Sequence, residues 1–389
     1  MIRIKRHSTK TWRWAVLTMF FINGAIMANW VSRIPQIQAN LAMSEGALGL
    51  VLLWLAVGVL LALSVAGGVI ARFGSRTITV AGALLLAATL LPLGIMPHPL
   101  ALSINLLFFG GAMSVMDVAM NAQAVDVERT LKRPVMSSFH AAFSIGGFVG
   151  AVMGGVMASL GIGPGGHFLI TAICFSLITL LAAPALHPTE AADGPDQSEP
   201  VFRLPDRVIW PLGAVAFCAA IGEGAMADWS GVYLKTVVGT GAATAALGFA
   251  AFSLTMTGGR LIGDYLTTRF IPAQLVRVGG VIASSGVLLA ILLPQVGPVL
   301  LGFGAVGAGL SIVVPLAFSV AGNVPGIQSG AGIAGVATIG YAGFLAGPPI
   351  IGLLAEITSL RAALIVVVIL TGSLIYTAQA MQLKPSQAN

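Results

Sequence analysis

The chain has 389 residues, of which 57% are hydrophobic and only 8% are charged. A soluble domain usually carries about 25% charged residues, so this composition excludes a water-soluble globular protein and favours an integral membrane protein. The net charge of +6 comes from short basic clusters between apolar segments, which argues against a nucleic-acid partner. Cys174 and Cys218 lie in apolar segments without metal-ligand spacing, so neither a disulfide framework nor a zinc site is expected.

Apolar runs of membrane-spanning length recur along the chain. The first run lacks the small-residue cleavage pattern of a signal peptide, so it is expected to remain as the first helix. The first half predicts helices at 12–32, 46–70, 77–97, 99–125, 135–160 and 165–187. The second half predicts helices at 207–231, 241–263, 273–294, 298–321, 328–355 and 359–382. Twelve spans place both termini on the same side of the membrane.

A single long polar segment divides the chain. Residues 188–206 carry five of the thirteen acidic residues, and we interpret them as a cytoplasmic linker between a bundle at 1–187 and a bundle at 207–389. The two halves repeat weakly: Ala25–Trp30 (AIMANW) is similar to Gly224–Trp229 (GAMADW) at an offset of 199 residues. Parallel repeats of this kind predict two six-helix bundles of the same topology that rock about a central site.

The distribution of basic residues predicts the orientation. All but three of the 19 Lys and Arg residues fall in the N-terminal arm, the even-numbered loops and the C-terminal tail, and the exceptions are Arg33, Lys235 and Arg361. Because cytoplasmic loops retain the positive excess, both termini are expected in the cytoplasm of a bacterial cell whose inner membrane holds the protein.

The loop after the second predicted helix, GGVIARFGSR at Gly67 to Arg76, resembles the loop signature of the major facilitator superfamily. That signature follows a Gly-rich helix end with Asp-Arg-x-Gly-x-Arg, and Ala71 stands here in place of the Asp. The second half has a related segment, GGRLIGDYLTTRF. The resemblance implies gating or structural roles for Arg72, Gly74, Arg76, Arg260 and Asp264.

Within this superfamily the sequence is most similar to the fucose-permease type of proton-coupled sugar transporters. That type has an acid on helix four followed by three small residues and Asn, as Asp117 to Asn121 does here. Its helix-one acid, four residues before Pro-Gln, is replaced by Val31, which precedes Pro35-Gln36. The resemblance implies a proton-coupled transporter of a sugar or related polar metabolite.

Ionisable side chains at membrane depth are costly and therefore indicate a partner, a cavity or a function. Asp117 is predicted near the membrane midplane, with Asn121 on the same helix face. His140 on the next helix is expected within about one helical turn of the same depth, where it either passes protons or only bonds the neighbouring helix. Asn23 and Tyr341 are predicted near mid-span and within reach of a central solute.

The seventh predicted helix carries two further acids. Glu223 lies between Gly222 and Gly224 and is a candidate for substrate or proton binding. Asp228 lies nearer the outer end, where we favour a structural salt bridge. The expected partners of either acid are Arg33 and Lys235.

These patterns predict an all-α membrane protein that moves a small-molecule substrate, with protons, across the lipid bilayer by alternating access, as a symporter. No cofactor, metal or nucleic acid is expected, and the expected oligomeric state is a monomer. No nucleophile and base occur together at helical spacing, so no catalytic residue is predicted and an enzyme is disfavoured. Two alternatives stay open: an efflux antiporter for drugs or metabolites with the same fold, and a membrane sensor that binds a solute without moving it.

Overall fold

The computed structural model describes residues 9–132, 135–188, 206–325, 327 and 329–382, and these form helices joined by short turns. Twelve helical segments among them are long and apolar enough to cross a membrane, which confirms the predicted fold class. Most of the predicted linker lies outside the described residues.

The first six spans contain seven helices, because the first span continues through a turn at Ser32-Arg33 into a short second helix. These elements are α1 (Thr9–Val31), α2 (Ile34–Asn40), α3 (Glu45–Phe73), α4 (Ser75–Leu93), α5 (Pro99–Leu131), α6 (Met136–Ser159), α7 (Pro164–Ala182) and the 3-10 turn η1 (Ala183–Ala185).

The last six spans contain eight helices, because two spans are interrupted. These elements are α8 (Trp210–Thr236), α9 (Ala242–Arg269), α10 (Pro272–Leu292), α11 (Val296–Leu310), α12 (Val313–Ala321), α13 (Ser329–Ile357), α14 (Leu360–Ala363), α15 (Ile365–Thr377) and the 3-10 turn η2 (Ala378–Met381).

Two departures from the predicted helices have clear causes. The tenth span breaks at Ser311-Ile312, because Pro315 has no N–H with which to bond the Ser311 carbonyl. The prediction for the fourth span ended with its apolar run at residue 125, whereas α5 continues to Leu131 through polar residues that favour helix. The apolar run therefore indicates which part of the helix lies in the membrane, and it does not indicate where the helix ends.

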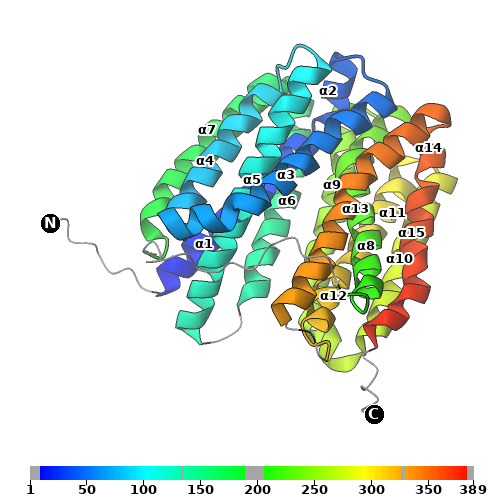
Figure 1. The fold of residues 1–389 in the computed structure, drawn as a ribbon. Coiled ribbons are helices and arrows are strands. Elements are labelled where there is room, and N and C mark those ends of the chain that lie inside the picture. The colour runs from blue at the N-terminus through cyan, green and yellow to red at the C-terminus, as the bar shows by residue number, and fades with distance from the viewer. Residues whose placement is uncertain (1–8, 133–134, 189–205, 326, 328, 383–389) are drawn as a thin grey trace.

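The helices gather into two groups that lie side by side, α1–α7 and α8–α15 (Figure 1). Within each group, glycines let helix backbones touch. A Cβ atom on Gly24 of α1 would lie 2.1 Å from the carbonyl oxygen of Phe143 on α6, and one on Gly279 of α10 would lie 2.3 Å from that of Gly309 on α11. Small residues at helix contacts are typical of membrane bundles, where close packing replaces the hydrophobic effect.

We call the side where α1 begins and α15 ends the terminus side, and the opposite side, where α2 lies, the far side (Figure 1). The two groups meet along three seams. The α3–α13 and α2–α8 seams lie in the far-side part of their helices, and the α6–α9 seam continues to mid-span, where a Cβ atom on Gly147 would lie 3.4 Å from Ser253 Oγ. Gly49 of α3 contacts Pro348 and Gly352 of α13, and Gly155 of α6 contacts the start of α9. At the third seam, Pro35 of α2 packs on α8.

The α2–α8 seam combines packing with a hydrogen bond. A Cβ atom on Gly231 would lie 3.1 Å from the Pro35 ring, and Lys235 Nζ donates to the Pro35 carbonyl oxygen at 3.3 Å. A second polar contact joins α3 to α13, where the backbone N–H of Gly46 donates to Glu356 Oε2 at 3.0 Å. These contacts hold the halves together at the far side.

Candidate functional site

Asp117 and Asn121 occupy one face of α5, as their spacing predicts. Asp117 lies two residues from the centre of this 33-residue helix. Asn121 Nδ2 donates to the Asp117 carbonyl oxygen at 2.8 Å and to its carboxylate Oδ1 at 3.3 Å. Both residues are half-buried and lie near the middle of the span.

The neighbouring helix α1 adds Asn23 to the same region. Asn23 is fully buried, and its Nδ2 donates to the Met113 carbonyl oxygen at 3.4 Å. In a helix that carbonyl also accepts the backbone N–H of Asp117, four residues later, so Asn23 lies beside the turn that carries Asp117. The Asn23 Oδ1 atom has no hydrogen-bond partner.

His140 of α6 packs against α1 and not against Asp117. Its ring meets the ring of Phe20 edge-on, with the centroids 5.4 Å apart, and the imidazole is exposed. Within the described part of the chain, no hydrogen bond joins His140 to Asp117. His140 therefore lines the same region without forming a direct proton relay to this carboxylate.

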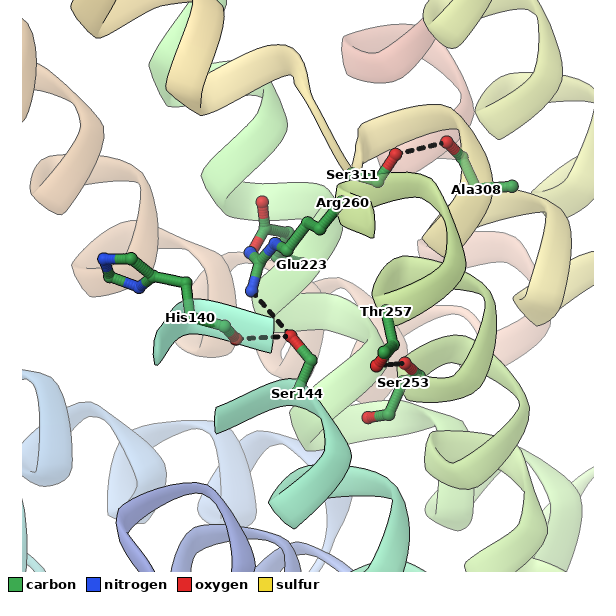
Figure 2. Close-up of polar contacts among 8 residues, drawn as sticks. All are labelled: His140, Ser144, Glu223, Ser253, Thr257, Arg260, Ala308 and Ser311. Carbon is green, nitrogen blue, oxygen red and sulfur yellow. Dashed lines mark hydrogen bonds and ion pairs between the residues drawn. The ribbon is translucent and has the colours of Figure 1, made fainter. Parts of the chain in front are cut away.

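The second half contributes an ion pair that reaches toward the first half. Glu223 is the central residue of α8, and its Oε2 lies 3.9 Å from Arg260 Nη2 of α9. Arg260 Nη1 also donates to Ser144 Oγ of α6 at 2.9 Å. Figure 2 shows Arg260 between Glu223 and Ser144, with the His140 imidazole pointing away from the pair. Arg260 thus bridges the two halves.

Tyr341 lies at mid-span in the second half. It is two residues from the centre of α13 and is half-buried. Asp117 lies equally near the centre of α5 in the first half. The two side chains are thus placed at mid-span on opposite halves, and no hydrogen bond joins them in the described part of the chain.

The predicted salt bridges of the α8 acids with Arg33 or Lys235 are wrong. Glu223 pairs with Arg260, and Lys235 bonds the Pro35 carbonyl oxygen. Asp228 lies three and seven residues before Gly231 and Lys235, so it shares the α8 face that meets α2. It is half-buried and makes no hydrogen bond or ion pair with any described residue.

Arg33 belongs to a buried hydrogen-bond network that was not predicted from the sequence. Its Nε donates to His167 Nδ1 at 3.0 Å and its Nη1 donates to Gln36 Oε1 at 2.8 Å. The Nδ1 atom of His167 is thereby the acceptor, so its Nε2 carries the proton and donates to Asn29 Oδ1 at 2.6 Å. This chain of bonds ties the α1–α2 turn to α7.

Replacing His167 with alanine is expected to lower the free energy of unfolding by about 2–4 kcal/mol. Arg33 and Asn29 would each lose a partner in a fully buried site, and each unsatisfied polar group costs about 1–3 kcal/mol. Thermal unfolding of the purified protein measures the effect. His98→Asn is the control, because exposed His98 caps the start of α5 and Asn also caps helices. Equal melting temperatures for the two variants would contradict the prediction.

The signature loop forms the α3–α4 turn. Gly74 has φ = +80°, a conformation that glycine adopts without strain, and its N–H bonds the Ile70 carbonyl oxygen. Arg72 is exposed and lies over the Phe73 ring at 5.2 Å, whereas Arg76 is half-buried. The Asp264 side chain lies outside the described part of the structure.

Ser144 and His167 were not singled out from the sequence. Ser144 lies in a Gly-rich run that indicates only packing, and its partner Arg260 is 116 residues away. His167 carried a usable signal, since a histidine inside an apolar run needs a partner. Among the described residues, no group of three or more His, Cys, Asp or Glu side chains could hold a metal ion.

Twelve spans in two groups, with sparse polar residues at mid-span and contacts that bridge the groups, define a membrane transporter of two six-helix halves. Comparison with known proteins agrees: the Major Facilitator Superfamily profile matches residues 15–328. The chain belongs to this superfamily and is a multi-pass integral membrane protein.

Its relatives include proteins of uncharacterised function. An uncharacterised MFS-type transporter of Yersinia pestis is 37% identical over 344 residues, covering 88% of this chain and 89% of the relative. The membrane protein MosC of Rhizobium meliloti is 32% identical over 356 residues, covering 91% and 86%.

Two solved transporters share the fold. A variant of the nucleoside transporter NupG superposes with a TM-score of 0.79 at 13% identity, covering 95% of this chain and 99% of NupG. A variant of the E. coli fucose:proton symporter FucP gives 0.63 at 16% identity, covering 96% and 99%.

Proposed function

We propose that this protein moves a small polar solute across the bacterial inner membrane by alternating access, coupled to protons as a symporter. The observation that carries the proposal is the arrangement at mid-span: Asp117 and Asn121 share one face of α5, and Arg260 joins Glu223 of α8 to Ser144 of α6 across the halves. A solute bound there contacts both halves and so senses their relative position.

The polar groups favour a solute with hydroxyl or amine groups. Asn121 and Tyr341 offer hydrogen-bond donors and acceptors, and the Asp117 carboxylate is a strong acceptor. The named structural neighbours move a nucleoside and fucose, both polyhydroxylated, which supports the same class here.

We propose proton coupling because ionised carboxylates at membrane depth are energetically unfavourable. An ionised carboxylate at membrane depth costs about 2.5–3.5 kcal/mol even on insertion scales, so it gains from a proton or a partner. Among the described side chains, Asp117 has Asn121 as its hydrogen-bond partner, and Glu223 has Arg260 as its ion-pair partner. Protonating Glu223 would weaken its hold on Arg260, the residue that bridges to Ser144. The protonation of Glu223 is thereby linked to the relative arrangement of the two halves.

The excess of basic residues on the terminus side assigns that side to the cytoplasm. The far-side seams then close the periplasmic side, and the structure represents a state closed to the outside. The halves 1–187 and 207–389 are the two bodies that move relative to one another.

Counterflow and uptake in proteoliposomes test the proposal. With an inward proton gradient imposed, the wild type is expected to accumulate a solute from a panel of sugars, nucleosides and amino sugars, and Asp117→Asn is expected to lose accumulation by at least about tenfold. One charge-assisted hydrogen bond contributes about 1.5–3 kcal/mol, which sets this scale.

Asp126→Asn on the same helix is the control, because Asp126 lies close to the terminus-side end of α5 and outside the site. Uptake that ignores the proton gradient would remove the symport mechanism and leave alternating access. Movement of the solute only in the direction opposite to the protons would instead identify an efflux antiporter.

A further inference from the structure

The charges at mid-span do not balance. The described spans bring three half-buried carboxylates, Asp117, Glu223 and Asp228, to the inner surfaces of α5 and α8. Among the residues that the structure describes, Arg260 is the one basic side chain in ion-pair distance of any of them, and it serves Glu223. Within the described residues, neither Asp117 nor Asp228 has a cationic partner. A cationic solute would supply the missing charge directly, alongside the protons of the proposed coupling.

The hydrogen bonds are unbalanced in the same sense. The Asn23 side chain is fully buried beside the turn that carries Asp117, and its Oδ1 atom accepts no hydrogen bond. A buried acceptor without a donor costs about 1–3 kcal/mol, so the native cycle is expected to provide one. Among the described residues, the Asp117 carboxylate receives a side-chain donor from Asn121 alone, at 3.3 Å. Two acceptors, Asn23 Oδ1 and the Asp117 carboxylate, therefore have unused capacity.

An aromatic ring completes the pattern. Tyr341 lies near the centre of α13, at mid-span like Asp117. A carboxylate and an aromatic ring at one depth suit an ammonium group, because the carboxylate neutralises the charge and the face of the ring attracts the cation. Helices α1, α3 and α4, which pack on α5, carry their ionisable residues only near their ends. Helix α6, which also contacts α5, contributes exposed His140, which makes no hydrogen bond to Asp117 in the described part of the chain.

We propose that the transported solute carries an ammonium group and that Asp117, with Asn23 and Tyr341, receives it. This inference rests on the proposed transport function and narrows its substrate class to polar organic cations. Three N–H donors of an ammonium would satisfy the Asp117 carboxylate and Asn23 Oδ1 together, while Asn121 remains available for a hydroxyl group of the solute.

The test is a thermal-shift screen of the purified full chain with matched pairs that differ in charge: glucosamine and glucose, and ethanolamine and ethylene glycol. The expected result is that cationic members stabilise the protein at concentrations at least tenfold below their neutral partners. A screen in which neutral members stabilise equally well, or in which no cationic member stabilises, overturns the inference.

Variants locate the effect. Asp117→Asn is expected to weaken binding of the cationic ligand roughly 10- to 100-fold, whereas Asp126→Asn leaves it unchanged. Asn23→Leu, which removes the unpaired oxygen and keeps the branched side-chain skeleton, is expected to weaken it several-fold, and it serves where Asp117→Asn fails to fold. Binding that survives both substitutions places the cation elsewhere and overturns the assignment.

The failure of this inference is distinguishable from failure of the transport proposal. If a neutral solute such as glucose is accumulated in a proton-dependent manner in proteoliposomes, the transport function stands and the ammonium assignment falls. If no solute of either charge is transported, the transport proposal itself falls.

Discussion

Replacing Gly49 with valine is expected to prevent closure of the far side and to reduce transport at least tenfold. A Cβ atom at Gly49 would lie 2.6 Å from the Pro348 carbonyl oxygen and 3.1 Å from the Gly352 Cα of α13. These are backbone atoms, which cannot rotate out of the way, so the halves must separate at this seam. Overpacking typically costs about 1–3 kcal/mol, which shifts a two-state equilibrium roughly 5- to 150-fold.

Distances between spin labels on the far side measure the shift. Labels at exposed Asn40 and Thr358, in a background without Cys174 and Cys218, report the separation of the halves. The label distance should lengthen in Gly49→Val, and solute flux in proteoliposomes should fall in parallel.

Gly68→Val on the same helix is the matched control. Gly68 has open space around its missing Cβ, so its substitution should leave both the label distance and the melting temperature near those of the wild type. An unchanged distance in Gly49→Val together with a lower melting temperature would show that this contact serves folding and not the closed state.

The sequence predicted the fold because the physics of the bilayer leaves few choices. Apolar runs of about 20 residues must form helices, since lipid cannot satisfy exposed backbone groups. The weak repeat around Trp30 and Trp229 indicated two halves. The break at Ser311 was also predictable in principle, because Pro315 removes one helical hydrogen bond. The end of α5 was not, because polar helix formers continue the helix beyond the membrane.

The pairing of the site residues was less predictable. The spacing of Asp117 and Asn121 is local, and their hydrogen bond follows from helix geometry. The partners of Glu223 depend on how α6, α8 and α9 pack, which sequence spacing does not encode. Arg33 was interpreted as a loop charge because the first helix was expected to end near residue 32. The chain instead turns into α2 and carries Arg33 into the bundle, where His167 accepts a hydrogen bond from its guanidinium group.

Replacing Arg260 with glutamine is expected to lower stability by about 1–3 kcal/mol and to abolish transport. The substitution leaves Glu223 without its cation at the centre of α8, and it removes the donor to Ser144 of the other half. Breaking a fully buried ion pair costs about 3–5 kcal/mol, and we scale this down because both side chains keep about a fifth of their surface exposed, at 23% and 18%.

The double variant Glu223→Gln with Arg260→Gln separates the two roles of the pair. It removes both charges, so stability is expected to return to within about 1 kcal/mol of the wild type, because neutral pairs often replace buried ion pairs without loss. Transport is expected to stay absent, because residue 223 can no longer take up a proton and no charged Arg260 is left for it to hold or release. Thermal unfolding and proteoliposome flux, measured over the double-mutant cycle, give the two readouts.

Arg269→Gln on the same helix is the control for a general loss of positive charge, since exposed Arg269 only stacks on Tyr265. A double variant that regains both stability and proton-coupled flux would make the pair purely structural. Proton coupling would then have to be assigned to Asp117, a mid-span acid of the first half.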